Sequence, residues 1–205
     1  MPNGLLRWGG IVAFAVLGGI FSGVFLLRPQ VVEISSGTLL KTPRIIEPFK
    51  LSSGNSATFT NASLLGHWTV LFPGFTFCPD VCPTTLTELK TVNAKLGVAA
   101  AKVRFVFLSV DPARDTPDRL WKYVMSFSAD FVGVTGDDAT LEKLGANIGY
   151  VYAKVPGATP ETYTVDHSTA LILINPEGQV AGYLTPPFKP DAIAEDLRKL
   201  VAKSF

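Results

Sequence analysis

Hydrophobic positions change their spacing several times along the second part of the chain. Short apolar runs rich in β-branched and aromatic residues, at 68–72 (WTVLF) and 103–110 (VRFVFLSV), predict two buried strands. Between them, apolar residues recur at spacings of three and four over 83–96, which predicts a helix that ends at Gly97. The pattern is therefore a strand, a helix and a second strand.

The same alternation continues to the C-terminus. Further elements follow in order: a helix beginning at 115–117 (Asp-Thr-Pro), a strand at 131–134, a helix over 137–144, a hairpin arm at 148–155, a hairpin of 170–174 and 179–183, and a helix at 190–203. An order of β-α-β-α followed by β-β-α predicts an α/β domain of thioredoxin type. We expect a thioredoxin-like fold with a central mixed β-sheet flanked by helices.

A long apolar run precedes this domain. Residues 10–27 (GIVAFAVLGGIFSGVFLL) carry no charge, and Arg7 and Arg28 bracket them. As a helix the run spans roughly 27 Å, nearly the thickness of a bilayer core. A cleaved signal peptide is the alternative, but it calls for a shorter core and a small-residue cleavage site. We expect one transmembrane helix at 10–27, a segment at 1–9 before it, a linker at 28–50 and the thioredoxin-like domain at 51–205.

The charge balance argues against one class of partner. The chain has 18 Lys and Arg against 17 Asp and Glu, a net charge of +1. Nucleic-acid binding generally calls for a strongly basic surface, so no nucleic-acid partner is expected.

Both cysteines of the chain lie in one short motif. Cys78 and Cys82 occur in FCPDVCP, after the first predicted strand and at the start of the following helix. Residues four apart share a helix face, so the two sulfurs can converge, and the free amides of the helix start favour thiolate. The pair can therefore bind a soft metal or undergo dithiol–disulfide exchange. A purely structural disulfide is a third interpretation, although so short a loop gains little from closure.

A third metal ligand would separate these interpretations. His167, in VDHS, precedes the run at 170–174, where a thioredoxin-type sheet carries the loop that faces the dithiol. The other histidine, His67, is expected at the far end of the first strand. Two thiolates and one imidazole suit Cu(I), and with a further ligand Cu(II), whereas zinc usually takes a fourth ligand or a water. A histidine before a strand is also often an ordinary polar residue.

Three acidic residues are candidates for an indirect role. Asp80 lies between the cysteines, Asp166 precedes His167, and Asp111 begins the loop DPARDTP at 111–117. Carboxylates are harder donors than thiolates, so we expect these residues to orient the site or to contact a partner rather than to bind copper. Helix capping by the loop at 111–117 is the structural alternative.

Three segments together resemble the Sco/SenC family of copper-binding assembly proteins. These are GFTFCPDVCP (74–83), LSVDPARDTP (108–117) and VDHS (165–168), and the resemblance extends from about residue 49 to the C-terminus. Residue by residue, Cys78, Cys82 and His167 match the copper ligands of the family, and Asp80 matches its acidic residue inside C-P-D-x-C. The chain departs from the family pattern at Phe77, where many members have His or Tyr.

The resemblance implies a function and a location. It implies a membrane-anchored copper metallochaperone that supports assembly of the binuclear copper site of cytochrome c oxidase subunit II, with other periplasmic copper chaperones as further partners. The alternative is a thiol-disulfide oxidoreductase whose redox dithiol, Cys78 and Cys82, reduces the cysteines of that subunit before metallation. A thiol peroxidase shares the fold, but no peroxide-binding Thr or Arg can be assigned around Cys78.

The resemblance also gives the orientation of the anchor. It places residues 1–9 in the cytoplasm and the domain in the periplasm, on a bacterial inner membrane. The mitochondrial inner membrane, with the domain in the intermembrane space, is the alternative; no long presequence rich in Arg and Ser precedes the span.

Overall fold

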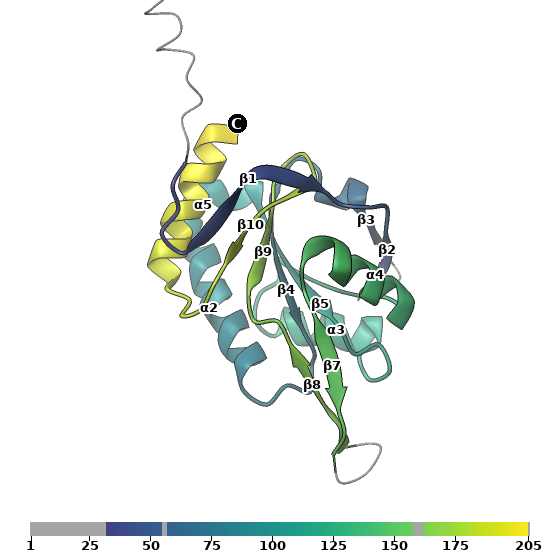
Figure 1. The fold of residues 1–205 in the computed structure, drawn as a ribbon. Helices are drawn as coiled ribbons and strands as arrows, with labels where there is room; N and C mark the ends of the chain where they lie inside the picture. The colour runs from purple at the N-terminus through teal and green to yellow at the C-terminus, as the bar shows by residue number, and fades with distance from the viewer. Residues whose placement is uncertain (1–31, 55–56, 158–161, 205) are drawn as a thin grey trace, which may run out of the picture. The chain divides into compact units, whose positions relative to one another are not determined.

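A computed structural model describes residues 32–54, 57–157 and 162–204 (Figure 1). The described elements lie in one compact unit that begins at Glu33. The strands are β1 (Gly37–Ile45), β2 (Lys50–Ser53), β3 (Thr58–Thr60), β4 (Trp68–Gly74), β5 (Val103–Ser109), β6 (Phe131–Thr135), β7 (Tyr152–Val155), β8 (Thr164–His167), β9 (Leu171–Ile174) and β10 (Gln179–Leu184). The helices are α2 (Val81–Leu96), α3 (Pro117–Met125), α4 (Asp138–Ile148) and α5 (Pro190–Ser204), with short 3-10 turns η2 (Asn61–Leu64) and η3 (Gly97–Lys102).

A mixed eight-stranded sheet forms the centre of the domain. Its strand order is β1-β10-β9-β4-β5-β6-β2-β3, and β7 and β8 form a separate two-stranded hairpin. The central strands β4, β5 and β6 are parallel, whereas β9 runs antiparallel to β4. All seven residues of β4 are buried, as expected of a strand covered on both faces. The predicted α/β class with a mixed sheet is confirmed.

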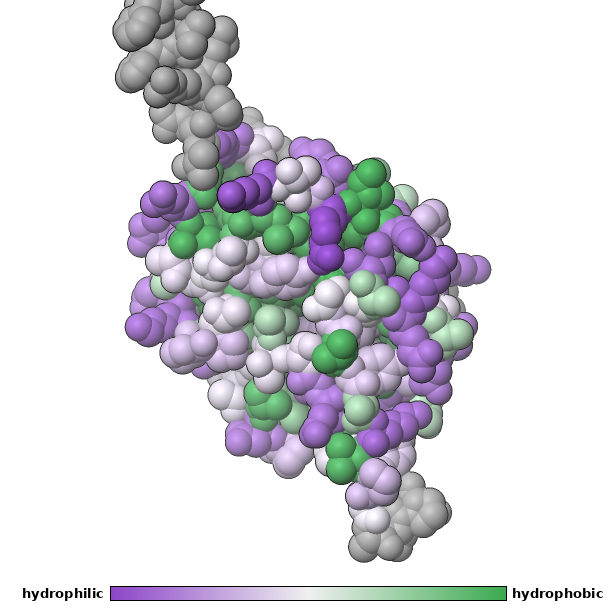
Figure 2. Space-filling model, in the orientation of Figure 1, coloured by the Kyte–Doolittle hydropathy of each residue, from purple (hydrophilic) through white to green (hydrophobic). Residues whose placement is uncertain are grey.

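Helices cover the sheet as the apolar spacing predicts. The buried side chains of α2 include Leu86, Leu89, Val92 and Leu96, the residues whose spacing predicts the helix. α2 packs beside α5 (Figure 1), and α3 packs on β6 and β2. In Figure 2 hydrophilic residues cover much of the visible face, with apolar residues in several separate patches.

The expected linker is wrong over residues 37–45. These residues form β1, which pairs antiparallel with β10 at the edge of the sheet. The segment before β1 is also held, because Ser35 and Ser36 donate backbone and hydroxyl hydrogen bonds to the buried Asp196 of α5. An edge strand is hard to recognise from sequence because it is largely solvent-exposed, and here its register also shifts between Leu39 and Arg44.

The expected transmembrane helix at 10–27 lies outside the described residues. Within residues 32–54, 57–157 and 162–204, no helix has both the length and the hydropathy that crossing a membrane requires.

The carboxyl ends of the parallel strands bring two loops to one edge of the sheet. β4 leads into the loop that carries Cys78, and β5 leads into the turn Asp111–Asp115. Loops that follow adjacent parallel strands meet at the same edge, which is where α/β proteins generally place their sites. The sheet therefore sets the place of the cysteine motif.

Candidate metal centre

The two thiols lie at the N-terminus of α2. Cys78 is in the loop after β4, and Cys82 is the second residue of α2, which begins at Val81. The amide of Cys82 donates a hydrogen bond to Cys78 Sγ over 3.4 Å. Both residues are free thiols in the structure, and both are buried, Cys82 completely. The sulfurs thus converge as the four-residue spacing predicts, but Pro83 occupies the third helical position rather than the first.

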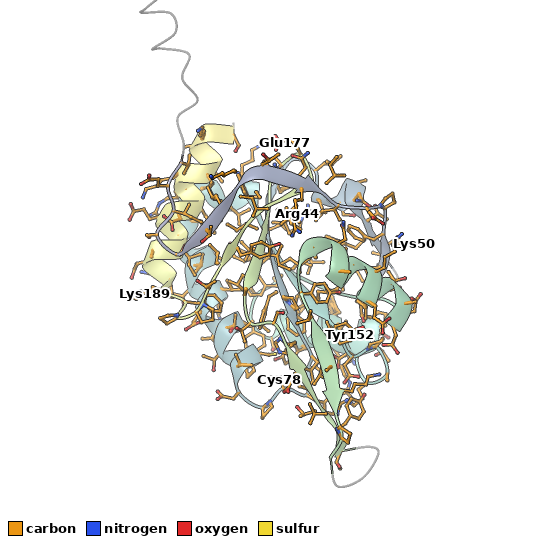
Figure 3. All side chains as sticks on the ribbon, in the orientation of Figure 1. Arg44, Lys50, Cys78, Tyr152, Glu177 and Lys189 are labelled. Carbon is orange, nitrogen blue, oxygen red and sulfur yellow. The ribbon has the colours of Figure 1, made fainter. Side chains whose placement is uncertain are left out.

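The third donor comes from the β7–β8 hairpin. His167 is the last residue of β8, and its Nε2 lies 3.6 Å from Cys82 Sγ. The ligand atoms of Cys78, Cys82 and His167 all lie within 4.8 Å of one another. Figure 3 labels Cys78 close to the ribbon of β8. Residues 85 positions apart in the sequence therefore meet in one cluster.

The imidazole of His167 is held in one orientation. Its Nδ1 lies 2.9 Å from the carbonyl oxygen of Ser168, and a carbonyl can only accept, so Nδ1 carries the proton and Nε2 is left with its lone pair. The rings of Phe72 and Phe75 contact the imidazole edge-on, at centroid distances of 6.1 and 6.0 Å. Burial lowers the pKa of His167, which favours the neutral form that binds metal.

The electrostatics of the buried thiol differ from the sequence-based expectation. Burial raises the pKa of Cys82 well above its ordinary value, and this outweighs the opposing effect of the Phe75 backbone hydrogen bond. The expectation that the helix start favours thiolate is therefore wrong for Cys82. Binding of a metal at this thiol has to release its proton.

The distances match those of a three-coordinate site. Sulfur and nitrogen ligands bound at about 2.0–2.3 Å in a trigonal arrangement lie roughly 4 Å from one another. The pair formed by Cys82 and His167 is at 3.6 Å, and no pair among the three exceeds 4.8 Å. Small side-chain movements would suffice to close the three donors around one ion.

The three acidic candidates occupy different positions. Asp80 is the exposed residue before α2, and its carboxylate accepts a hydrogen bond from the Thr84 hydroxyl. Asp166 is exposed on β8, and its charge partly opposes the lowering of the His167 pKa. Asp111 is fully buried, so its side chain is not at the surface where a partner could contact it. The structure brings none of the three into the donor cluster.

Several neighbours of the cluster were not expected from the sequence. The rings of Phe72 and Phe75 pack against the imidazole of His167. Gly74 lacks a side chain next to Cys82, and a Cβ at this position would lie 2.9 Å from Cys82 Sγ. The only available signal was their position directly before the cysteine motif. His67 lies at the opposite end of β4, as expected, and its Nδ1 is near the Leu65 carbonyl oxygen.

The chain resembles known proteins over most of its length. The SCO1/SenC family model matches residues 38–202. A Stutzerimonas stutzeri protein whose name ascribes copper binding to it is 34% identical over 176 residues, 85% of each chain. Bradyrhizobium japonicum ScoI, solved with copper bound, is 36% identical at a TM-score of 0.70 and covers 76% of this chain and 99% of its own. Yeast Sco1 with copper bound is 28% identical at a TM-score of 0.72, covering 80% of this chain and 91% of its own. On these matches, the chain belongs to the SCO1/SenC family.

Proposed function

We propose that this protein is a membrane-anchored copper metallochaperone that binds copper through Cys78, Cys82 and His167. The single observation that carries the proposal is the convergence of two thiols and one imidazole within 4.8 Å. Soft sulfur ligands select Cu(I), and neutral imidazole suits copper in either oxidation state. Relatives solved with copper bound support the same choice of metal.

The three donors differ in how easily they can be displaced. Cys82 is completely buried, whereas His167 is half-buried and lies on a hairpin outside the main sheet. In the proposed transfer, thiolates of the partner replace His167 first and then the two cysteines in turn. Copper thus passes by exchange of ligands, without being released as a free ion.

The proposed partner is subunit II of cytochrome c oxidase, whose binuclear copper site would receive the metal. Other periplasmic copper chaperones are proposed as further partners. The anchor is the apolar run at 10–27, with the domain in the periplasm of a bacterial inner membrane. The mitochondrial inner membrane is the alternative location. Family membership supports these assignments.

An anaerobic Cu(I) competition titration on the reduced, full-length protein in detergent tests the metal site. We expect one tightly bound copper, loss of that binding in Cys78→Ser, and at least about tenfold weaker binding in His167→Ala. His67→Ala is the matched control, because His67 lies at the far end of β4, and it should bind like wild type. Copper affinity indifferent to His167 would refute its role as a ligand.

A second candidate function follows from the asymmetry of the two thiols. Cys78 receives the Cys82 amide hydrogen bond, whereas burial raises the pKa of Cys82. A thiol whose sulfur accepts a backbone hydrogen bond, beside a completely buried partner thiol, is an arrangement suited to thiol–disulfide exchange. In that reaction the dithiol of this protein becomes a disulfide, and two electrons and two protons reduce a disulfide of the oxidase subunit.

The two functions can be separated by their dependence on His167. A reductase needs both cysteines but not the imidazole, so His167→Ala should still reduce a disulfide-bonded peptide that copies the cysteine motif of the oxidase subunit. A dithiol potential too oxidising to reduce that disulfide would exclude this second function.

A further inference from the structure

His167 is carried by an element that is not part of the main sheet. β8 pairs only with β7, and this hairpin shares no ladder with the eight-stranded sheet among the described strands. The two thiols, in contrast, follow directly from the central strand β4. Besides the short connection from His167 to β9, contacts between the hairpin and the rest of the domain therefore set how close the imidazole lies to the sulfurs.

One buried carboxylate provides such a contact. The hydroxyl of Tyr163, the residue before β8, donates to Asp111 Oδ1 over 2.5 Å. The other oxygen of Asp111 accepts from Arg114 Nε, and Arg114 Nη1 donates to the backbone carbonyl of Tyr163 over 2.9 Å. The guanidinium also stacks on the Tyr163 ring, 3.7 Å from its centroid. We call Asp111, Arg114 and Tyr163 the hairpin clamp.

The hairpin clamp also touches the cysteine loop. The Arg114 guanidinium lies 5.7 Å from the ring centroid of Phe75 and 4.8 Å from that of Phe77, the residue directly before Cys78. Arg114 therefore lies between the loop that carries the first thiol and the hairpin that carries the imidazole. Its side chain is only 18% exposed and its partner Asp111 is fully buried, so solvent weakens their ion pair little.

The same turn fixes the cysteine loop by a second carboxylate. Asp115 is fully buried and accepts hydrogen bonds from the amide and the hydroxyl of Thr76, at 2.8 and 2.5 Å. It also accepts from the Ser109 hydroxyl at the end of β5, over 2.6 Å. Backbone hydrogen bonds from Arg114 and Asp115 to the Asp111 carbonyl make the turn itself compact. One rigid turn thus holds both halves of the donor cluster.

We propose that Asp111, Arg114 and Tyr163 are positioning residues that dock the β7–β8 hairpin so that His167 stays within reach of the two thiols. None of the three touches the donor atoms. The inference rests on the proposed copper site for its purpose, whereas the docking contacts themselves involve only side chains and backbone of this chain. The sequence suggested that Asp111 orients the site, contacts a partner or belongs to a capping loop, but it gave no indication of Tyr163.

The test uses Tyr163→Phe, which removes one hydroxyl and keeps the ring under Arg114. Tyr152→Phe is the matched control: it lies on the same hairpin, opposite His167, and its buried hydroxyl has no hydrogen-bond partner among the described residues. Asp111→Asn is a second variant of the hairpin clamp that removes charge at constant size. Thermal unfolding establishes that each variant is folded.

The first measurement needs no copper. The chain has two histidines, so histidine-labelled full-length protein in detergent gives two imidazole signals, and His67 serves as an internal reference. In wild type, the ring currents of Phe72 and Phe75 should displace the His167 signal. We expect Tyr163→Phe and Asp111→Asn to broaden that signal or to move it toward the unshifted position. Tyr152→Phe should leave it in place.

The second measurement is Cu(I) affinity. Tyr163→Phe should weaken binding about tenfold, and it should cause no further loss in a His167→Ala background, because its effect acts through His167. A His167 signal unchanged in Tyr163→Phe, or a displaced signal with wild-type copper affinity, would overturn the positioning role. If wild type bound no copper while Tyr163→Phe still released the imidazole, the docking would stand and the proposed copper function would fail.

Discussion

Gly74 is the position where the smallest possible change should disturb the metal site. It is the last residue of β4, and a Cβ added there would lie 2.9 Å from Cys82 Sγ and 2.7 Å from Cε2 of the Phe107 ring. Favourable contacts between heavy atoms lie at about 3.5–4.0 Å, so each neighbour must move away by roughly 0.6–1.3 Å. Phe107 is itself packed against the rings of Phe72 and Tyr123, so much of the movement falls on the Cys82 sulfur.

Two quantities should change in Gly74→Ala. Overpacking a close-packed core costs about 1–3 kcal/mol, partly offset by about 0.4–1 kcal/mol because alanine restricts the unfolded chain. We therefore expect the free energy of unfolding to fall by about 1–2 kcal/mol in a urea titration. Copper affinity should fall by at least about tenfold, since metal ligands have to be placed within about 0.2 Å.

A matched glycine separates the effect on the site from the effect on stability. In Gly133→Ala, on β6, the new methyl group would lie 3.2 Å from Leu120 Cβ, away from both cysteines. That variant should lose stability but keep its copper affinity. Gly74→Ala with wild-type copper affinity would refute the reasoning. Equal loss of affinity in both variants would show that general destabilisation, and not displacement of Cys82, is responsible.

Three further predictions concern stability and its pH dependence. Asp196→Ala removes the buried acceptor of the part-buried donors of Ser35 and Ser36 and should lower the free energy of unfolding by about 1–3 kcal/mol in urea, with unchanged copper affinity; an unchanged midpoint would contradict this. Because the pKa of His167 is lowered in the folded protein, the unfolded chain binds this proton more tightly. The free energy of unfolding of protein prepared without copper should therefore fall as pH drops below 6.5, and it should fall less in His167→Gln. Because burial raises the pKa of Cys82, the unfolded chain loses this proton at a lower pH than the folded protein does, and the free energy of unfolding should decline as pH rises above 9.0. An equal decline in Cys82→Ala would exclude this cause.

The structure changes how the loop at 111–117 is understood. Thr116 does cap α3, since its hydroxyl accepts from the Arg119 amide, so the capping interpretation is confirmed for that residue. Asp115, the other capping candidate, instead accepts from Thr76 and Ser109 and so fixes the cysteine loop. Asp111 is buried beneath Arg114 and Tyr163. The contacts of Asp115 with Thr76 and of Asp111 with Tyr163 join residues 39 and 52 positions apart, and no local pattern encodes them.

Local sequence patterns determined the central elements and the first two donors. The apolar run of β4 and the apolar spacing of α2 are local patterns. They predict a buried strand and an amphipathic helix without information about the rest of the chain. The convergence of Cys78 and Cys82 was expected from their four-residue spacing at the start of a helix, although Cys78 itself lies in the loop before α2. Three motifs in register also carried the family resemblance, which the match over residues 38–202 confirms.

Only the tertiary structure decided the features that depend on distant parts of the chain. The pairing of β1 with β10, which replaces part of the expected linker, joins the two ends of the domain. The 3.6 Å approach of His167 to Cys82 depends on where a separate hairpin docks. The pKa of Cys82 is raised by burial among surrounding elements, which its position at the start of a helix did not reveal. The periodicity of apolar residues indicates which face of a helix or strand is buried. Docking of the hairpin, desolvation of a thiol and pairing of an edge strand depend on which other element packs against that face. The tertiary structure alone shows which element that is.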